Sequence, residues 1–238
     1  MKRFNVLILL FFIFYAASDL YGIEVNNCAH LPIIDNQRDS IKENQILYNG
    51  RIWRNLYYLV QGDQFLFSKE FLPGSLSIGG KTYPNILLKY DIFSDEILTP
   101  IDSGKILQLN KELVDSFSVI FQDKKYRFTK IKEDSQKIFK SFVNVIYEGK
   151  TALYVKYNKK IDRSSIEGKS DNFYQTSLIY FVNDKIVYTI SNKSDLFTIF
   201  KKDKAQIRDF IKKNKLKVSK KEPGSFAQII IYYDSISR

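Results

Sequence analysis

The stretch FVNVIYEGKTALYVKY, residues Phe142–Tyr157, decides the fold class. Apolar and polar residues alternate on both sides of Glu148–Lys150, which is the pattern of strands with one buried face. Glu148–Lys150 itself is a short turn signal, so the two halves predict an antiparallel hairpin. In the second half, Leu153, Val155 and Tyr157 fall on one face, which we expect to face the core.

The same combination of turn signal and flanking apolar runs occurs elsewhere along the chain. It is present at Gly62–Asp63, Gly79–Gly80, Asp123–Lys124 and Asn183–Asp184. One such turn is weak evidence, but a series of them predicts a sheet built from successive hairpins. We therefore expect an α+β protein whose main part, residues 46–190, is a mostly antiparallel β-sheet domain.

The turn at Asp123–Lys124 also predicts a strand register. A two-residue loop there would place Phe121 opposite Tyr126 and Val119 opposite Phe128. Aromatic and β-branched pairs of this kind stabilise a sheet by about 0.2–1 kcal/mol each.

Two stretches interrupt the strand pattern, and one aromatic residue stands out. Asn110–Asp115 predicts a single helical turn, and Arg163–Asn172 predicts a polar loop. Trp53, the only tryptophan, lies in RIWRNLYYLV and is expected to be a core or half-buried strand residue.

Residues 191–238 change from strand to helix periodicity. We expect a short helix from Ser194 or Asp195 to Phe200, and two further helices after it. The capping-box spacing S/T/D-x-x-E/Q predicts where these two begin. The boxes are Asp203 with Gln206 and Ser219 with Glu222, and the apolar stripe of the last helix is Phe226, Ile229, Ile230 and Tyr233.

Residues 1–22 resemble a secretory signal peptide. A basic start is followed by the apolar run Val6–Ala17, which is too short to cross a bilayer as a helix. We place the cleavage between Gly22 and Ile23 and interpret 23–45 as a flexible leader. This predicts an exported protein, in the periplasm, at the outer envelope or secreted, with no transmembrane segment in the mature chain.

The composition excludes several kinds of site. The 238 residues contain one Cys and one His, which rules out a disulfide framework and zinc sites of the usual Cys/His types. Both residues, Cys28 and His30, lie in the expected leader, and Asn27 before the cysteine does not suit lipidation. We therefore expect no cofactor, no metal site and no catalytic residue from these two side chains.

The one acidic cluster is Asp91, Asp95 and Glu96. Paired carboxylates can hydrolyse glycosides, so a hydrolase acting on envelope polysaccharide is one alternative. The sequence between the flanking apolar runs favours a β-turn, where Ser and Asp are common.

Positive charge is concentrated near the C-terminus. Lys201–Lys221 holds ten basic residues and two acids, a net charge of +8 in a chain whose total is +11. Such a segment favours an anionic envelope surface, either lipid headgroups or acidic polysaccharide, although a merely solvated helix face has the same pattern. Nucleic acid is disfavoured because few aromatic residues are interleaved with the lysines. The candidate binding residues are Arg208, Lys212, Lys213, Lys215 and Lys217.

Two segments, Trp53–Pro100 and Ile207–Lys221, resemble a group of uncharacterised exported bacterial proteins. The resemblance covers most of the mature chain and implies an extracytoplasmic setting without a known activity. We therefore expect a non-enzymatic protein with a binding or scaffolding role at the bacterial cell envelope. A carrier whose aromatic-rich sheet encloses an apolar ligand such as a lipid is the other alternative.

Overall fold

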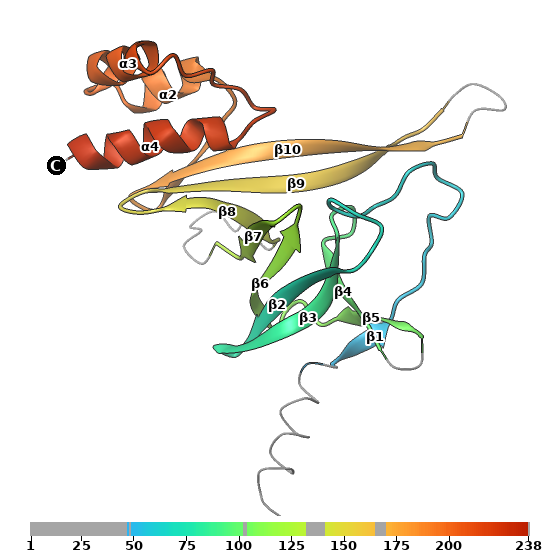
Figure 1. Cartoon of the computed structure of the whole chain (residues 1–238). Coiled ribbons are helices and arrows are strands. Elements are labelled where there is room, and N and C mark those ends of the chain that lie inside the picture. Colours follow the sequence, from blue (N-terminus) through green and yellow to red (C-terminus); the bar gives the residue numbers. More distant parts are fainter. Residues whose placement is uncertain (1–46, 48, 102–103, 132–140, 165–169, 238) are drawn as a thin grey trace, which may run out of the picture.

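The computed structural model describes residue 47 and residues 49–101, 104–131, 141–164 and 170–237 (Figure 1). The expected signal peptide, its cleavage site between Gly22 and Ile23, and the leader with Cys28 and His30 lie outside these residues.

Eleven strands in the described part of the chain form one sheet, in the order β1-β5-β4-β3-β2-β6-β7-β8-β9-β10-β11. All the pairings between neighbouring strands are antiparallel, which confirms the predicted fold class. The strands are β1 (Gly50–Ile52), β2 (Leu72–Ile78), β3 (Lys81–Asp91), β4 (Glu96–Pro100), β5 (Ile106–Leu109), β6 (Val114–Phe121), β7 (Lys124–Thr129), β8 (Val143–Glu148), β9 (Ala152–Asp162), β10 (Asn172–Asn183) and β11 (Ile186–Ile190).

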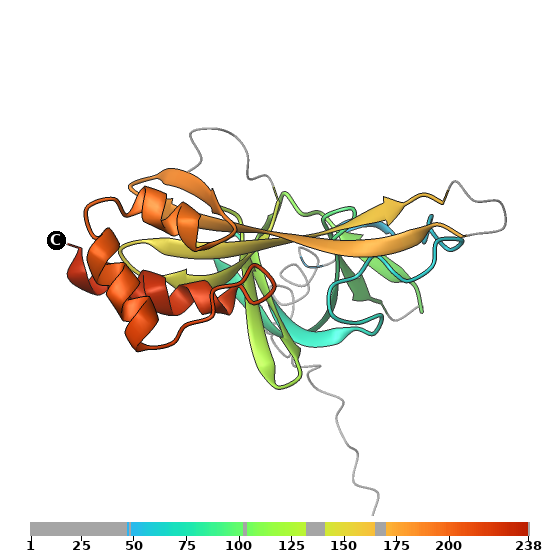
Figure 2. The same ribbon diagram turned by 90° about the horizontal axis from the view of Figure 1, so that it is seen from above.

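Helices α2 (Lys193–Ile199), α3 (Lys204–Lys213) and α4 (Gly224–Ile236) follow the sheet. Both ribbon views show them gathered at one end of the molecule (Figures 1 and 2). Helix α4 contacts strands β8 and β9, and α3 packs on α4. The expected helical appendage is therefore present and lies against one end of the sheet.

The two hairpins with the clearest glycine signals form as predicted. Gly79–Gly80 joins β2 to β3 with φ values of +57° and +79°, which glycine adopts without steric cost. The chain reverses around Gly149 between β8 and β9. Leu153 and Val155 are fully buried and Tyr157 is partly buried, as the alternation indicates.

The predicted register between β6 and β7 is wrong by two residues. The turn is Gln122–Asp123, with φ values of +49° and +58°, one residue earlier than expected. Val119 therefore lies opposite Tyr126, and Phe117 lies opposite Phe128. The last two rings stack at 4.7 Å inside an aromatic core, and this tertiary packing selects the register. A shift of two leaves every side chain on its predicted face, because the period of a strand is two.

The turn between β10 and β11 is also displaced by one residue. Asp184–Lys185 has φ values of +48° and +65°, and Asn183 pairs with Ile186 instead of forming the turn. Two successive residues of positive φ fit the right-handed twist of the flanking strands.

The hairpin predicted at Gly62–Asp63 does not form, because neither Leu56–Val60 before it nor Gln64–Phe67 after it is a strand. The chain on either side of Leu56–Val60 is fastened to other strands: Trp53 N donates to Ile106 O at 2.8 Å, and Gln61 forms a parallel bridge with Asn172. Trp53 is half-buried as expected but lies just after β1, not in it.

The expected interruptions are found where they can be observed. A turn spans Lys111–Leu113 and leads directly into β6 at Val114. The polar stretch Arg163–Asn172 connects β9 to β10, although 165–169 lie outside the described residues.

Neither predicted capping box, Asp203 with Gln206 or Ser219 with Glu222, caps the start of a helix. Asp203 is the N-cap of α3 but its side chain caps no backbone group, and α4 begins after Pro223. The box forms at α2 instead, between Asn192 and Asp195. The Ser219 and Glu222 backbones pair with each other in the turn before α4, so this pair precedes the helix.

Most of the core lies in two apolar clusters, and a small third one has Val143 and Tyr180 as its buried members. The first lies among β2–β7 and includes the packed rings of Tyr90, Phe117, Phe128 and Phe142. The second joins β9–β11 to the helices, and Tyr157 packs against both. In this second cluster, the fully buried residues from α4 are Phe226, Ile229 and Ile230, which belong to the predicted helical stripe.

Candidate functional site

Helix α3 carries much of the charge concentrated near the C-terminus. Its apolar residues Ile207 and Ile211 are buried in the core that the helices share with the sheet. Arg208 follows Ile207, and Lys212 follows Ile211. Each basic side chain is therefore rotated by about 100° around the helix axis from its buried neighbour, and both are exposed. The alternation therefore builds an amphipathic helix with a basic outer surface.

The chain after α3 turns back through a Schellman motif. Leu216 N donates to Ile211 O at 3.0 Å, and Lys215 N donates to Lys212 O at 3.2 Å. Lys215 has a φ of +51°, the left-handed conformation that the motif requires. Leu216 is thereby held beside the end of α3, while the Lys215 side chain remains exposed.

A groove of about 440 Å³ lies between α2 and α3, and we call it the basic groove. Its lining residues are of two kinds: buried or half-buried apolar side chains form the floor, and exposed basic side chains form the rim. The floor consists of Phe197, Ile211 and Leu216, and the rim of Lys193, Arg208, Lys212 and Lys215.

Aromatic contacts bring the basic side chains and the groove floor together. The Arg208 guanidinium carbon lies 5.5 Å from the centroid of the Phe197 ring, and Lys204 Nζ lies 5.9 Å from it. Cation–π contacts of this length hold the cations over the ring while their polar groups still face solvent.

The candidate cations have no acidic partner in the part of the chain that the structure describes. All five are exposed, and none lies within ion-pair distance of a carboxylate there. Exposed cations without local neutralisation create a positive potential that is available to an outside anion. The five residues are Arg208, Lys212, Lys213, Lys215 and Lys217.

The structure brings only some of these five residues together. Arg208, Lys212 and Lys215 line the basic groove, whereas Lys213 and Lys217 are exposed outside it. Sequence reasoning missed Lys193 and Phe197, which α2 contributes. Neither belongs to the basic run, and only the packing of α2 beside α3 places them in the groove.

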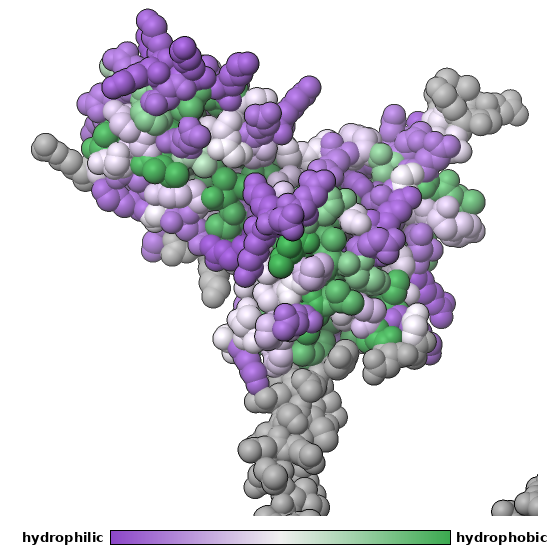
Figure 3. Space-filling view, viewed as in Figure 1, coloured by the Kyte–Doolittle hydropathy of each residue, from purple (hydrophilic) through white to green (hydrophobic). Residues whose placement is uncertain are grey.

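The space-filling view agrees with this description (Figure 3). Hydrophilic residues crowd the surface over the helices, and hydrophobic residues are visible between them. This mixture of strongly polar and apolar surface is what an amphipathic partner would require.

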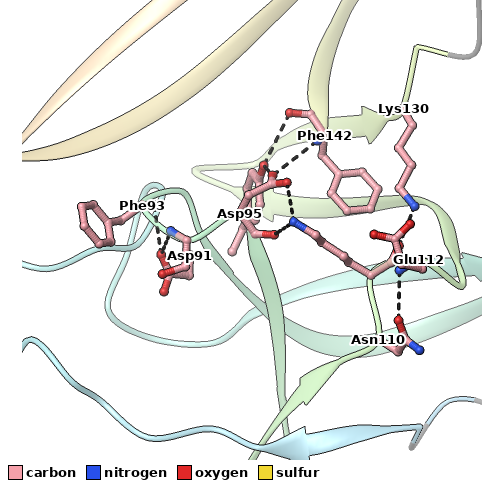
Figure 4. A network of polar contacts seen from close by, with 10 residues as sticks. Asp91, Phe93, Asp95, Asn110, Glu112, Lys130 and Phe142 are labelled. Carbon is pink, nitrogen blue, oxygen red and sulfur yellow. Dashed lines mark hydrogen bonds and ion pairs between the residues drawn. The ribbon is translucent and has the colours of Figure 1, made fainter. Parts of the chain in front are cut away.

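The acidic cluster serves the fold of the sheet. Asp95 accepts hydrogen bonds from the Tyr90 hydroxyl at 2.7 Å, from Lys111 Nζ at 3.1 Å and from Phe142 N at 3.4 Å (Figure 4). Burial, with the Asp95 carboxylate, raises the pKa of the Tyr90 hydroxyl well above its ordinary value. Asp95 thus joins the β3–β4 turn to segments preceding β6 and β8.

Asp91 and Glu96 face each other directly across β3 and β4. Asp91 is 1% exposed and accepts from the backbone N–H groups of Phe93 and Ser94, both at 2.9 Å, so it holds the turn together. Burial raises the pKa of the Asp91 carboxyl to about 6 and also raises the pKa of Glu96. Asp91 and Asp95 therefore stabilise the turn Ile92–Asp95, and Glu96 is the first residue of β4 after it.

No protein-family model, no curated protein and no solved structure matches this chain. Among the described residues, no three Cys, His, Asp or Glu side chains gather as metal ligands would. Within the same residues, no helix combines the length and the apolar character needed to span a bilayer.

Proposed function

We propose that this protein is an exported, non-enzymatic binding protein that attaches to the bacterial cell envelope, and that its basic groove docks on anionic lipid. The observation that carries the proposal is the groove itself, with four exposed cations around an apolar floor. The expected signal peptide supports the envelope setting.

The apolar floor favours lipid over acidic polysaccharide. Each basic residue near an anionic membrane contributes about 1 kcal/mol of attraction, and a polysaccharide could supply similar charges. A polysaccharide, however, would leave Phe197 and Leu216 facing polar groups or water. A lipid places its phosphate among the rim cations and its first methylenes over the floor, so both kinds of lining residue are used.

The test is vesicle co-sedimentation with the full mature chain. Vesicles of phosphatidylcholine with phosphatidylglycerol should bind the protein in a salt-sensitive manner, and pure phosphatidylcholine should bind it much less. Changing Arg208, Lys212 and Lys215 to Gln removes three rim charges. At about 1 kcal/mol per charge, binding to the anionic vesicles should weaken by about 100-fold.

A matched variant separates the groove from overall charge. Lys69, Lys105 and Lys125 are exposed, and no ion pair holds them among the described residues, so changing them to Gln removes the same charge from the sheet end. This control should bind within a few-fold of wild type. Equal losses in the two triple variants would contradict a groove-specific site. Retention on immobilised polygalacturonate, with no vesicle binding, would replace lipid by acidic polysaccharide.

A further inference from the structure

An apolar turn protrudes between β1 and β2, far from the basic groove along the sheet. Tyr57 O accepts from Val60 N at 3.0 Å, so Tyr58 and Leu59 occupy the two corners of a β-turn. These corner side chains are 74% and 77% exposed, and Leu56 beside them is 75% exposed. Three large apolar side chains exposed together mark a contact surface. We call Leu56–Val60 the apolar turn.

The base of the apolar turn is anchored to the sheet. Gln61 N donates to Asp171 O at 2.8 Å, and Phe173 N donates to Gln61 O at 3.0 Å, which ties the turn to the start of β10. The Tyr57 ring packs edge-on against Phe93 at 4.8 Å and against Phe173 at 6.0 Å. The exposed tip is therefore presented on a fixed support.

Some backbone polar groups of the apolar turn are bonded locally. Tyr57 N donates to Asn55 Oδ1 at 3.0 Å, in addition to the bond from Val60 N across the corner. Local bonding of this kind lowers the cost of moving a loop from water to a less polar surface.

Positive charge flanks the apolar turn. Arg51 and Arg54 are exposed, and neither lies within ion-pair distance of a carboxylate in the described residues. Arg51 Nε donates to Gln108 Oε1 at 3.1 Å, and Arg51 is close enough to Glu96 to favour its charged form. The neighbouring Asp63 is already bonded to Lys159 Nζ at 2.8 Å, so its charge is locally neutralised. An apolar tip with exposed arginines behind it complements an anionic membrane surface, where Tyr occupies the interface and Arg meets the headgroups.

We propose that the apolar turn inserts into the interfacial region of an anionic bilayer and forms a second membrane contact. The ribbon views place it at the opposite end of the molecule from the helices (Figures 1 and 2). The two contacts are structurally independent. The inference extends the proposed lipid attachment, but it rests on different residues and can fail separately.

The direct test places a fluorescent tryptophan at the tip of the apolar turn. Trp53 is the only tryptophan, so a Trp53→Phe, Tyr58→Trp variant carries its single tryptophan at a corner of the turn. Vesicles of phosphatidylcholine with phosphatidylglycerol should shift its emission to the blue, and brominated acyl chains should quench it. An unchanged spectrum with the protein bound to the vesicles would overturn the inference while leaving the proposed function intact.

The second measurement removes the apolar side chains. The double variant Leu56→Ser, Leu59→Ser should bind vesicles about 10- to 30-fold more weakly than wild type at high salt. The reason is that binding no longer removes two leucine side chains from water. Leu113→Ser with Ile186→Ser, at exposed apolar positions elsewhere, should leave it unchanged. Equal vesicle binding by the two double variants at high salt would refute insertion.

If the triple groove variant bound as wild type while the Leu56/Leu59 variant lost binding, the proposed groove function would fail and the insertion would stand. No vesicle binding at all by the wild-type chain would refute both.

Discussion

Replacing Asp234 tests how the C-terminal helices are held on the sheet. Asp234 lies in α4 and is 7% exposed. Its Oδ2 accepts from Thr151 N at 3.0 Å and from the Tyr147 hydroxyl at 2.9 Å, while its Oδ1 accepts from the Thr151 hydroxyl at 2.7 Å. These bonds join α4 to the turn between β8 and β9.

The free-energy cost of Asp234→Ala follows from the donors left behind. Thr151 is 4% exposed, so its N–H and hydroxyl would have no acceptor, whereas the partly exposed Tyr147 hydroxyl can turn to water. An unsatisfied buried donor costs about 1–3 kcal/mol, so we expect a loss of about 3 kcal/mol in the free energy of unfolding. Asp234→Asn keeps an oxygen for two donors and offers its NH₂ to the Thr151 hydroxyl. We expect it to cost only about 1 kcal/mol.

Urea denaturation measures both losses, with far-UV circular dichroism for the helices and Trp53 fluorescence for the opposite end of the sheet. With a slope of about 2 kcal/mol per molar urea, the midpoint should fall by about 1.5 M for the Ala variant and about 0.5 M for the Asn variant. Asp209→Ala, at an exposed position on α3, is the matched control and should leave the midpoint unchanged.

Two results would refute this reasoning. If Asp234→Ala unfolded at the midpoint of the Asp209 control, the buried bonds would contribute nothing to stability. The two probes should also change together, because Tyr157 on β9 packs against both apolar clusters. Loss of the helical signal well before the Trp53 signal would show that the helices unfold separately from the sheet.

Two further changes test the sheet itself. Burial raises the pKa of the Asp91 carboxyl from 3.8 to about 6. Between these two pH values the folded state binds more protons than the unfolded state, so the free energy of unfolding of the wild type should fall as the pH rises through this range. Asp91→Asn cannot ionise and should gain about 2–3 kcal/mol relative to wild type between pH 4 and pH 7, whereas a pH-independent difference in thermal unfolding would contradict this. A Cβ at Gly74 would lie 2.0 Å from Ser118 O of β6, so Gly74→Ala should prevent β2 from pairing closely and lower Tm by well over 10 °C. Gly79→Ala, at a turn with φ +57° and open space around the new methyl group, should cost only about 1 kcal/mol, and equal losses for the two glycines would refute the steric argument.

Local patterns in the sequence were sufficient for the fold class and for most strand and helix positions. The alternation in Phe142–Tyr157 predicts a hairpin and a buried face, and both are found. The stripe Phe226, Ile229 and Ile230 predicts the buried face of α4, although Ile and Tyr also favour strands. Such patterns succeed because burial has the period of the local backbone, which does not depend on the partner.

Turn positions and register required the tertiary structure. In QDKK, several neighbouring pairs can adopt positive φ, so the local chemistry does not choose among them. The stacked rings of Phe117 and Phe128 make the choice, since only one register brings them together in the aromatic core. Leu56–Val60 illustrates the same point: its composition suits a strand, but it forms the apolar turn, and the chain pairs with the start of β10 only at Gln61.

The sequence by itself determined that the protein has a hairpin-built sheet, helical C-terminal residues and a concentration of positive charge between Lys201 and Lys221. Only the tertiary structure decided which of these charges act together. Lys193 and Phe197 join Arg208 at one groove because α2 packs beside α3, whereas Lys213 and Lys217 are not among the residues that line it. The physical reason is that charge and propensity are local properties, whereas a groove is formed by side chains from elements whose contact depends on the packing of the whole core.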